Sequence, residues 1–113
     1  MEKLTQYRQI IKQVLQHYMD IIKKCPDPNQ ETEIVLDEVG DHYLMHDIGW
    51  ADTKRIWNTS VYVRIRNGKF YIEIDWLEQG IATDLLEKGV PKEDIVLAFH
   101  HPSVRPWTEF AVA

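Results

Sequence analysis

The sequence predicts an α+β domain in which a long N-terminal helix packs on a mainly antiparallel sheet of about five strands. Three observations predict it: a helical apolar repeat over residues 4–22, β-branched and aromatic segments from Glu31 onward, and a hairpin signal at Asn67-Gly68. A shorter helix is expected between the fourth and fifth strands. A chain of 113 residues with 44% hydrophobic content can bury its own core, so residues 1–113 are expected to form a single domain.

The first expected element is an amphipathic helix from Leu4 to Ile22, stopped by Pro26 and Pro28. Its apolar residues recur at intervals of three and four, at Leu4, Tyr7, Ile11, Val14, Tyr18 and Ile21. This stripe could also form one strand of a coiled coil, but it lasts only about three heptads and sheet sequence follows. Packing on the chain's own sheet is therefore favoured, with part of the stripe left open to a second subunit.

Two strands are expected next, over residues 34–39 and 43–50, with a turn at Gly40 and Asp41. A hairpin follows, with strands 55–66 and 69–75 joined by a type I′ turn, because Asn-Gly tolerates two consecutive positive φ angles. Closing this turn pairs Ile65 with Phe70, Val63 with Ile72 and Val61 with Ile74 on the inner face. It pairs Arg64 with Tyr71 and Tyr62 with Glu73 on the outer face.

The second helix is expected to begin with a capping box, in which Asp75 is the cap and Glu78 reaches back to its backbone. Gly89 and Pro91 would end this helix, and Pro91 would open a short turn through residue 94. The apolar run from Ile95 to Phe99 is short enough for a strand buried on both faces.

Composition sets further limits on compartment and partners. Cys25 is the only cysteine, and neither a signal peptide nor an apolar membrane-spanning segment is present, so a cytoplasmic protein is expected. With 13 Lys and Arg against 18 Asp and Glu, the net charge is -5. That sign does not suit broad contact with phosphates, so DNA contact is expected to be local or indirect.

Catalytic and metal sites are weakly indicated. The carboxylates that could serve a metal-dependent enzyme are Asp47, Asp75 and Glu78, but Asp75 and Glu78 are explained by the expected cap, and Asp47 by a solvent-facing strand position. The histidines form no helical pair within an expected helix and have no nearby Cys-x-x-Cys, and the glycines form no phosphate-binding loop. No catalytic residue, metal ligand or cofactor is therefore expected.

Two surfaces are candidate binding sites. The outer face of the hairpin should gather a basic patch with aromatic neighbours, which could bind a partner or a nucleic-acid strand or be only a solvated sheet face: Tyr62, Arg64, Arg66, Lys69 and Tyr71. The C-terminal segment ends without charge and is expected to dock on the domain or on a partner subunit, through Arg105, Trp107, Phe110 and Val112.

The order of these signals resembles the XisI family of element-excision controlling factors. The resemblance runs from Leu4-x-x-Tyr7-Arg8 through Gly49-Trp50 and Asn67-Gly68-Lys69 to the closing Phe110-Ala111-Val112-Ala113, and its most specific part is residues 89–100. It covers nearly the whole chain.

The resemblance implies a cyanobacterial, non-catalytic controlling factor for excision of the fdxN element, a programmed DNA rearrangement. A separate site-specific recombinase makes the cuts in that system. The family usually occurs beside XisH, whose sequences resemble restriction-type nucleases, which implies action through such protein partners. A small sequence-specific DNA-binding module and a metal-dependent enzyme remain alternatives, and a homo-oligomer remains open.

Overall fold

A computed structural model describes residues 2–113. Helix α1 spans Glu2–Lys24, and the strands are β1 (Gln30–Asp37), β2 (His42–Ala51), β3 (Lys54–Arg66), β4 (Lys69–Asp75) and β5 (Ile95–Val96). Helix α2 (Ile81–Glu87) and the 3-10 turn η1 (Lys92–Asp94) lie between β4 and β5, and a second 3-10 turn, η2, spans Arg105–Trp107. The predicted α+β class and element order are confirmed.

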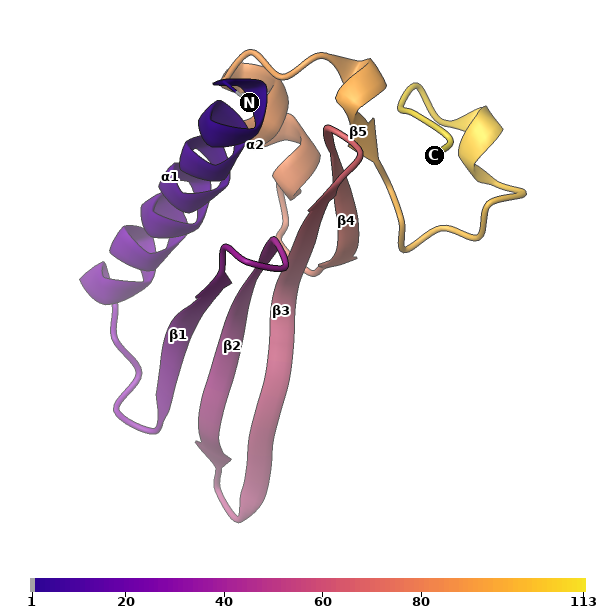
Figure 1. The fold of residues 1–113 in the computed structure, drawn as a ribbon. Coiled ribbons are helices and arrows are strands. Elements are labelled where there is room, and N and C mark those ends of the chain that lie inside the picture. Colours follow the sequence, from indigo (N-terminus) through magenta and orange to yellow (C-terminus); the bar gives the residue numbers. More distant parts are fainter. Residues whose placement is uncertain (1) are drawn as a thin grey trace.

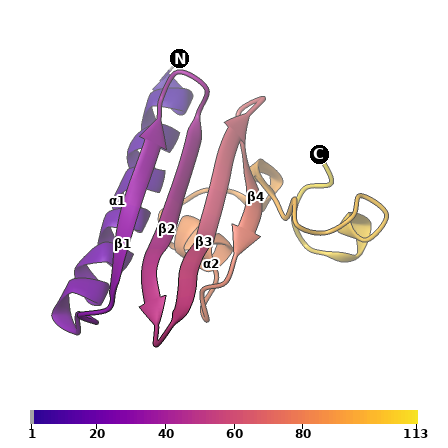
Figure 2. The same ribbon diagram turned by 90° about the horizontal axis from the view of Figure 1, so that it is seen from below.

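The five strands form one sheet in the order β1-β2-β3-β4-β5. The first four pair antiparallel with their neighbours in sequence, and β5 pairs parallel to β4. Figure 1 shows α1 running along one side of this sheet, with the β2–β3 hairpin extending beyond its neighbours. Figure 2 shows that both helices lie on the same face, while no helix covers the other. We call these the inner and the outer face.

The inner face meets α1 through side chains that water does not reach. Ile11 and Leu15 are fully buried in one cluster with Tyr43, Val63 and other strand residues. The Tyr7 ring stacks on the Phe70 ring with centroids 4.7 Å apart. Each fully buried aliphatic or aromatic side chain stabilises the fold by about 1.5–3 kcal/mol before chain entropy is subtracted. The C-terminal end of the predicted stripe was wrong, because Met19 is buried whereas Ile21 and Ile22 are exposed.

The β3–β4 hairpin closes as predicted and then departs from the predicted register. Asn67 and Gly68 have φ of 54° and 72°, as a type I′ turn requires. The pairs from the turn to Val63 and Ile72 follow the prediction, but a bulge then pairs Tyr62 with Ile74 and Val61 with Asp75. The predicted pairs of Tyr62 with Glu73 and Val61 with Ile74 were therefore wrong. The extra residue moves Ile74 to the outer face, beside Tyr62.

Helix α2 begins later than the capping box predicted. Its N-cap is Gly80, which makes no side-chain cap. Asp75 instead accepts hydrogen bonds from the backbone N–H groups of Leu77 and Ile81, at 3.1 and 2.8 Å, so it still fixes the start of α2 from a distance. Glu78 is exposed and takes no part in the cap.

Two strand boundaries also differ from prediction. β1 starts at Gln30 and ends at Asp37, so Val39 lies in the turn and is 97% exposed. β5 keeps only Ile95 and Val96, both fully buried, because main-chain hydrogen bonds turn the chain over residues 96–100.

Candidate functional site

The predicted basic patch on the outer face of the hairpin is assembled, but two of its three cations are engaged within the chain. Arg64 forms an ion pair with Glu73, with both Nε and Nη2 at 2.9 Å from Oε2. Lys69 donates a hydrogen bond to the main-chain oxygen of Ala113. Arg66 alone is exposed on the hairpin end without a partner among the described residues. The patch therefore presents much less positive charge than its composition suggests.

The aromatic residues of the patch are half-buried and tied to their neighbours. The Tyr62 hydroxyl lies 2.9 Å from Nδ1 of His42, and their rings meet edge to face at 5.8 Å. Tyr71 lies opposite Arg64 in the ladder, as predicted. These contacts hold the rings against the sheet and leave only parts of them open to a ligand.

The C-terminal segment is held beside β5 by Arg105. The Arg105 guanidinium donates to the main-chain oxygens of Ala98, His100 and Val112 at 3.0–3.3 Å. Phe110 packs against the core cluster, and Ala111 bonds to Ile95 at 2.8 Å. Trp107, in contrast, is 87% exposed, and Val112 is also exposed. The segment thus docks on its own domain through Phe110 and Ala111 while presenting Trp107 outward.

The three carboxylates considered for metal chemistry do not form a metal site. Asp47 accepts a hydrogen bond from Thr32 Oγ1 at 2.7 Å and is half-buried on the same side as Met45, so its predicted solvent-facing position was wrong. Asp75 is engaged by the backbone of residues 77 and 81. Within residues 2–113, no group of three or more His, Cys, Asp or Glu side chains could hold a metal ion.

No described helix is long and apolar enough to cross a membrane.

A cluster that the sequence did not predict lies at the far end of the outer face. The Arg55 guanidinium carbon is 5.0 Å from the Trp50 ring centroid and 5.6 Å from that of Trp57. His46 meets the Trp57 ring edge to face at 4.5 Å. Trp50 and Trp57 are 50% and 65% exposed. Only the pairing of β2 with β3 brings these residues together, although their alternation along each strand places them all on one face.

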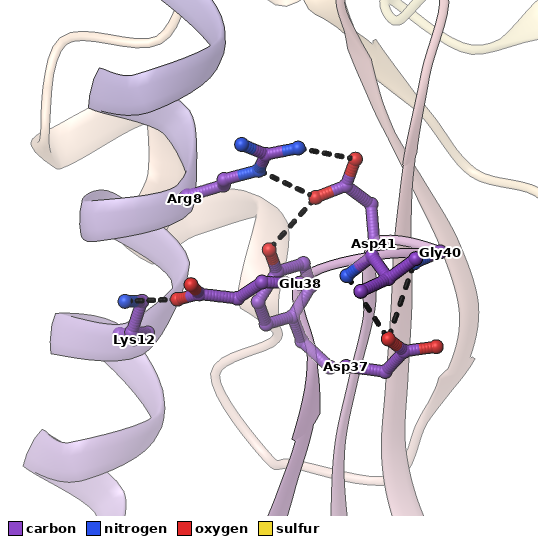
Figure 3. A network of polar contacts seen from close by, with 8 residues as sticks. Arg8, Lys12, Asp37, Glu38, Gly40 and Asp41 are labelled. Atoms are coloured by element: carbon purple, nitrogen blue, oxygen red, sulfur yellow. Dashed lines mark hydrogen bonds and ion pairs between the residues drawn. The ribbon is translucent and has the colours of Figure 1, made fainter.

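Charged side chains along helix α1 join it to the rest of the domain. Arg8 and Tyr43 both donate to Asp41 in the β1–β2 turn, and Lys12 pairs with Glu38 in the same turn (Figure 3). The hydrogen bonds from Arg8 are the main reason that the pKa of Asp41 lies below its ordinary value. The turn itself is closed by Asp37, which accepts from the backbone of Val39 and Gly40 at 3.0 and 3.2 Å.

A second polar connection lies at the start of α1. Lys3 and Tyr7 both reach Asp94, at 2.8 and 2.5 Å. Partial burial of Asp94 would raise its pKa, but the hydrogen bonds from Lys3 and Tyr7 outweigh that effect and lower it. Further along, Tyr18 donates to Asp84 of α2. Asp94 thus joins α1 to η1, and Asp84 joins α1 to α2.

Comparison with known proteins gives consistent matches over nearly the whole chain. A family model described as XisI protein matches residues 1–112. The crystal structure of the fdxN element excision controlling factor XisI from Anabaena variabilis is 40% identical, with a TM-score of 0.86 over 98% of this chain and 99% of that chain. A XisI-like protein from the same organism is 30% identical, with a TM-score of 0.89 over 97% of this chain and 99% of that chain. No curated protein matches.

Proposed function

The chain belongs to the XisI family, and we propose that it is a non-catalytic controlling factor for site-specific excision of a DNA element, acting through protein partners. The observation that carries the proposal is the 40% identity, over nearly the full length of both chains, to a protein named as the fdxN element excision controlling factor. The partners that fit the proposal are an XisH-like nuclease and a site-specific recombinase.

The environments of the acidic side chains support a non-catalytic role. A carboxylate that serves as a metal ligand or general base needs oxygens free to meet a substrate or an ion. Both oxygens of Asp75 accept backbone hydrogen bonds, and Asp47 is bound by Thr32. Asp75 fixes the start of α2, and Asp47 contacts β1 through Thr32, so we assign both carboxylates a structural role.

Action through protein partners is supported by the state of the basic patch. A protein that binds duplex DNA tightly neutralises several phosphates with free Lys and Arg side chains. Arg64 and Lys69 are already engaged by Glu73 and by the main chain of Ala113. The exposed tryptophans, in contrast, belong to the residue types enriched at protein interfaces.

The experiment that tests the proposal combines binding and genetics in the host. The purified chain is mixed with the XisH-like nuclease of the same organism, and complex formation is followed by size-exclusion chromatography. In parallel, excision of the element is measured in a strain lacking this gene. A stable complex together with loss of excision is expected. A normal excision level in the deletion strain would contradict the proposal.

A specificity control separates partner binding from folding. Trp107→Ala removes the most exposed tryptophan of the chain, and its side chain contributes no buried area to the core. If the nuclease binds the C-terminal segment, this variant melts like the wild type but elutes without the nuclease. Val39→Ala serves as the matched control, because Val39 in the β1–β2 turn is even more exposed than Trp107. This variant is expected to retain the complex.

A further inference from the structure

No helix in the described residues 2–113 covers the outer face of the sheet (Figure 2). Paired residues on adjacent strands share a face. The ladders therefore align Val35 on β1 with Leu44 on β2, then with Tyr62 on β3 and Ile74 on β4. A second aligned row joins Ile48 to Trp57.

The first row forms an apolar band across four strands, and the polar row of Glu33, His46 and Thr59 separates it from Ile48 and Trp57. Val35 and Trp57 are exposed, and Leu44, Ile48, Tyr62 and Ile74 are half-buried. The bulge in β4 adds Ile74 to this band instead of to the core. Single exposed apolar residues are ordinary on a protein surface, but a continuous band across four strands marks an interaction surface.

The charges on this face have opposite signs on the two sides of β2. On β1 the outer face carries acids, Glu31, Glu33 and Asp37, whereas on β3 it carries Arg55 and also Arg64, which is already paired with Glu73. Register places Glu31 at the level of Trp57, next to Arg55 along β3, and Asp37 at the level of Arg64. The acidic strand and the basic strand thus flank β2, whose outer face carries Leu44, Ile48 and Trp50 together with His42 and His46.

This arrangement complements itself. A two-fold axis parallel to β2 exchanges the two sides of the strand and keeps each position along it. Asp37 of one copy then faces Arg64 of the other, and Glu31 faces Trp57 beside Arg55. Val35 faces Tyr62, and Leu44 and Ile48 lie close to their own counterparts. Two identical twisted sheets pack face to face with nearly aligned strands, and two-fold dimers are the commonest protein assemblies.

We propose that the outer face binds a second copy of this chain in a symmetric, face-to-face dimer centred on β2. The proposal concerns assembly and does not depend on the role in excision. Leu44 and Ile48 lie at the centre of the interface, and the pair of Glu31 with Arg55 of the second copy lies near its rim. The Trp50, Arg55 and Trp57 cluster is then covered by the acidic strand of the other subunit.

Sedimentation equilibrium of the full chain tests the proposal. The wild type is expected to be a dimer. Leu44→Glu places two carboxylates next to the axis and is expected to give a folded monomer, whereas Val39→Glu, in the exposed turn, leaves the dimer intact. Far-ultraviolet circular dichroism and thermal melting establish that each variant is folded. If Leu44→Glu does not fold, Trp57→Ala replaces it, since that side chain is already 65% exposed.

A charge exchange tests the orientation of the two copies. Glu31→Arg and Arg55→Glu are each expected to raise the dimer dissociation constant about tenfold, and the double variant is expected to restore it, because both contacts recur with their charges exchanged. A monomeric wild type, a dimer that persists in Leu44→Glu, or a failure of the double variant to recover would overturn the proposal. Loss of the dimer in Trp107→Glu alone would place the interface at the C-terminal segment and would overturn it as well.

Discussion

Arg8 on helix α1 and Asp41 in the β1–β2 turn form a two-pronged ion pair that joins the helix to the sheet. Arg8 Nε lies 2.8 Å from Asp41 Oδ1, and Nη2 lies 3.2 Å from Oδ2. Asp41 also has a φ of 58° and offers its main-chain oxygen to Ile65 N–H at 3.1 Å. Asp41 therefore connects helix α1, the β1–β2 turn and the end of the central strand β3.

Removing the guanidinium should destabilise the fold measurably. Arg8→Met keeps the aliphatic stem but leaves Asp41 with Tyr43 as its remaining side-chain donor, so the urea midpoint should fall. The stability of Arg8→Lys should lie between that of the wild type and that of Arg8→Met, because a lysine keeps the charge but cannot make the two-pronged contact. Urea denaturation measures all three proteins. Arg66→Met is the control, and it should change stability by less than about 0.5 kcal/mol.

Acid should destabilise the protein through Asp41 and Asp94, whose pKa values lie below the ordinary ones. Because the unfolded chain binds protons more readily at these groups, their contribution is complete above the unfolded pKa of about 3.9 and is lost as pH falls through the lower folded values. Urea midpoints measured as a function of pH should show this loss. Asp94→Asn should be less stable at neutral pH and show a shallower decline in acid. An unchanged acid slope in that variant would count against the assignment.

Asp75 should behave as a structural acceptor in a graded way. Asp75→Ala loses both backbone contacts and should cost about 1–3 kcal/mol. Asp75→Asn retains one acceptor oxygen and should cost about half as much as Asp75→Ala. This cost exceeds the one expected for replacing an N-cap aspartate by asparagine, because each carboxylate oxygen of Asp75 has its own donor. Chemical denaturation ranks the two variants. Equal loss of excision activity in both, with wild-type stability, would indicate a chemical role instead.

Gly49 should not tolerate a side chain. A Cβ at this position would lie 2.2 Å from the main-chain oxygen of Asn29, which accepts a hydrogen bond from Trp50 N–H at 3.0 Å. Gly49→Ala should therefore move the start of β1 and cost about 1–3 kcal/mol. Gly40→Ala meets only side-chain atoms of Asp37 and His42, at 2.9 Å, and should cost less. Thermal melting compares the two, and equal costs would contradict the explanation.

Direct binding of duplex DNA by the isolated chain should be weak and only slightly dependent on salt. If three cations were free, the logarithm of the binding constant would fall with that of salt concentration at a slope of roughly -3, at about -0.9 per phosphate. With Arg64 and Lys69 engaged, the slope should be closer to about -1. Fluorescence anisotropy on element-end and scrambled duplexes measures it. Tight, sequence-selective binding would favour the DNA-binding alternative.

The parts of the fold that sequence predicts best are those decided by neighbouring residues. The turn at Asn67 and Gly68 requires positive φ angles, and alternation around it places Val63 and Ile72 on the inner face. The β4 bulge was not predictable in this way, because Ile74 suits either face by composition. Its outward position depends on Asp75 being drawn to the backbone of α2.

The candidate site was harder to predict for a similar reason. Composition correctly gathers Arg64, Arg66 and Lys69 on one hairpin, but whether each of these cations is free or paired depends on the partners that the fold supplies. Lys69 meets the main chain of Ala113, and no local pattern predicts that contact. Arg55 lies between two tryptophans only after β2 and β3 have paired. Long-range pairing therefore decides which predicted cations remain available.

The two edges of the sheet differ in a way that affects self-association. Beside β5, Ala111 bridges to Val96 and bonds to Ile95, so the C-terminal segment occupies backbone groups at that edge. β1 forms the opposite edge, and one of its sides has no neighbouring strand. An open strand edge is a template for aggregation, and natural proteins guard such edges with charge. Glu31 and Glu33 place like charges along β1, so two such edges that approach each other in a crowded solution repel before their backbones can pair.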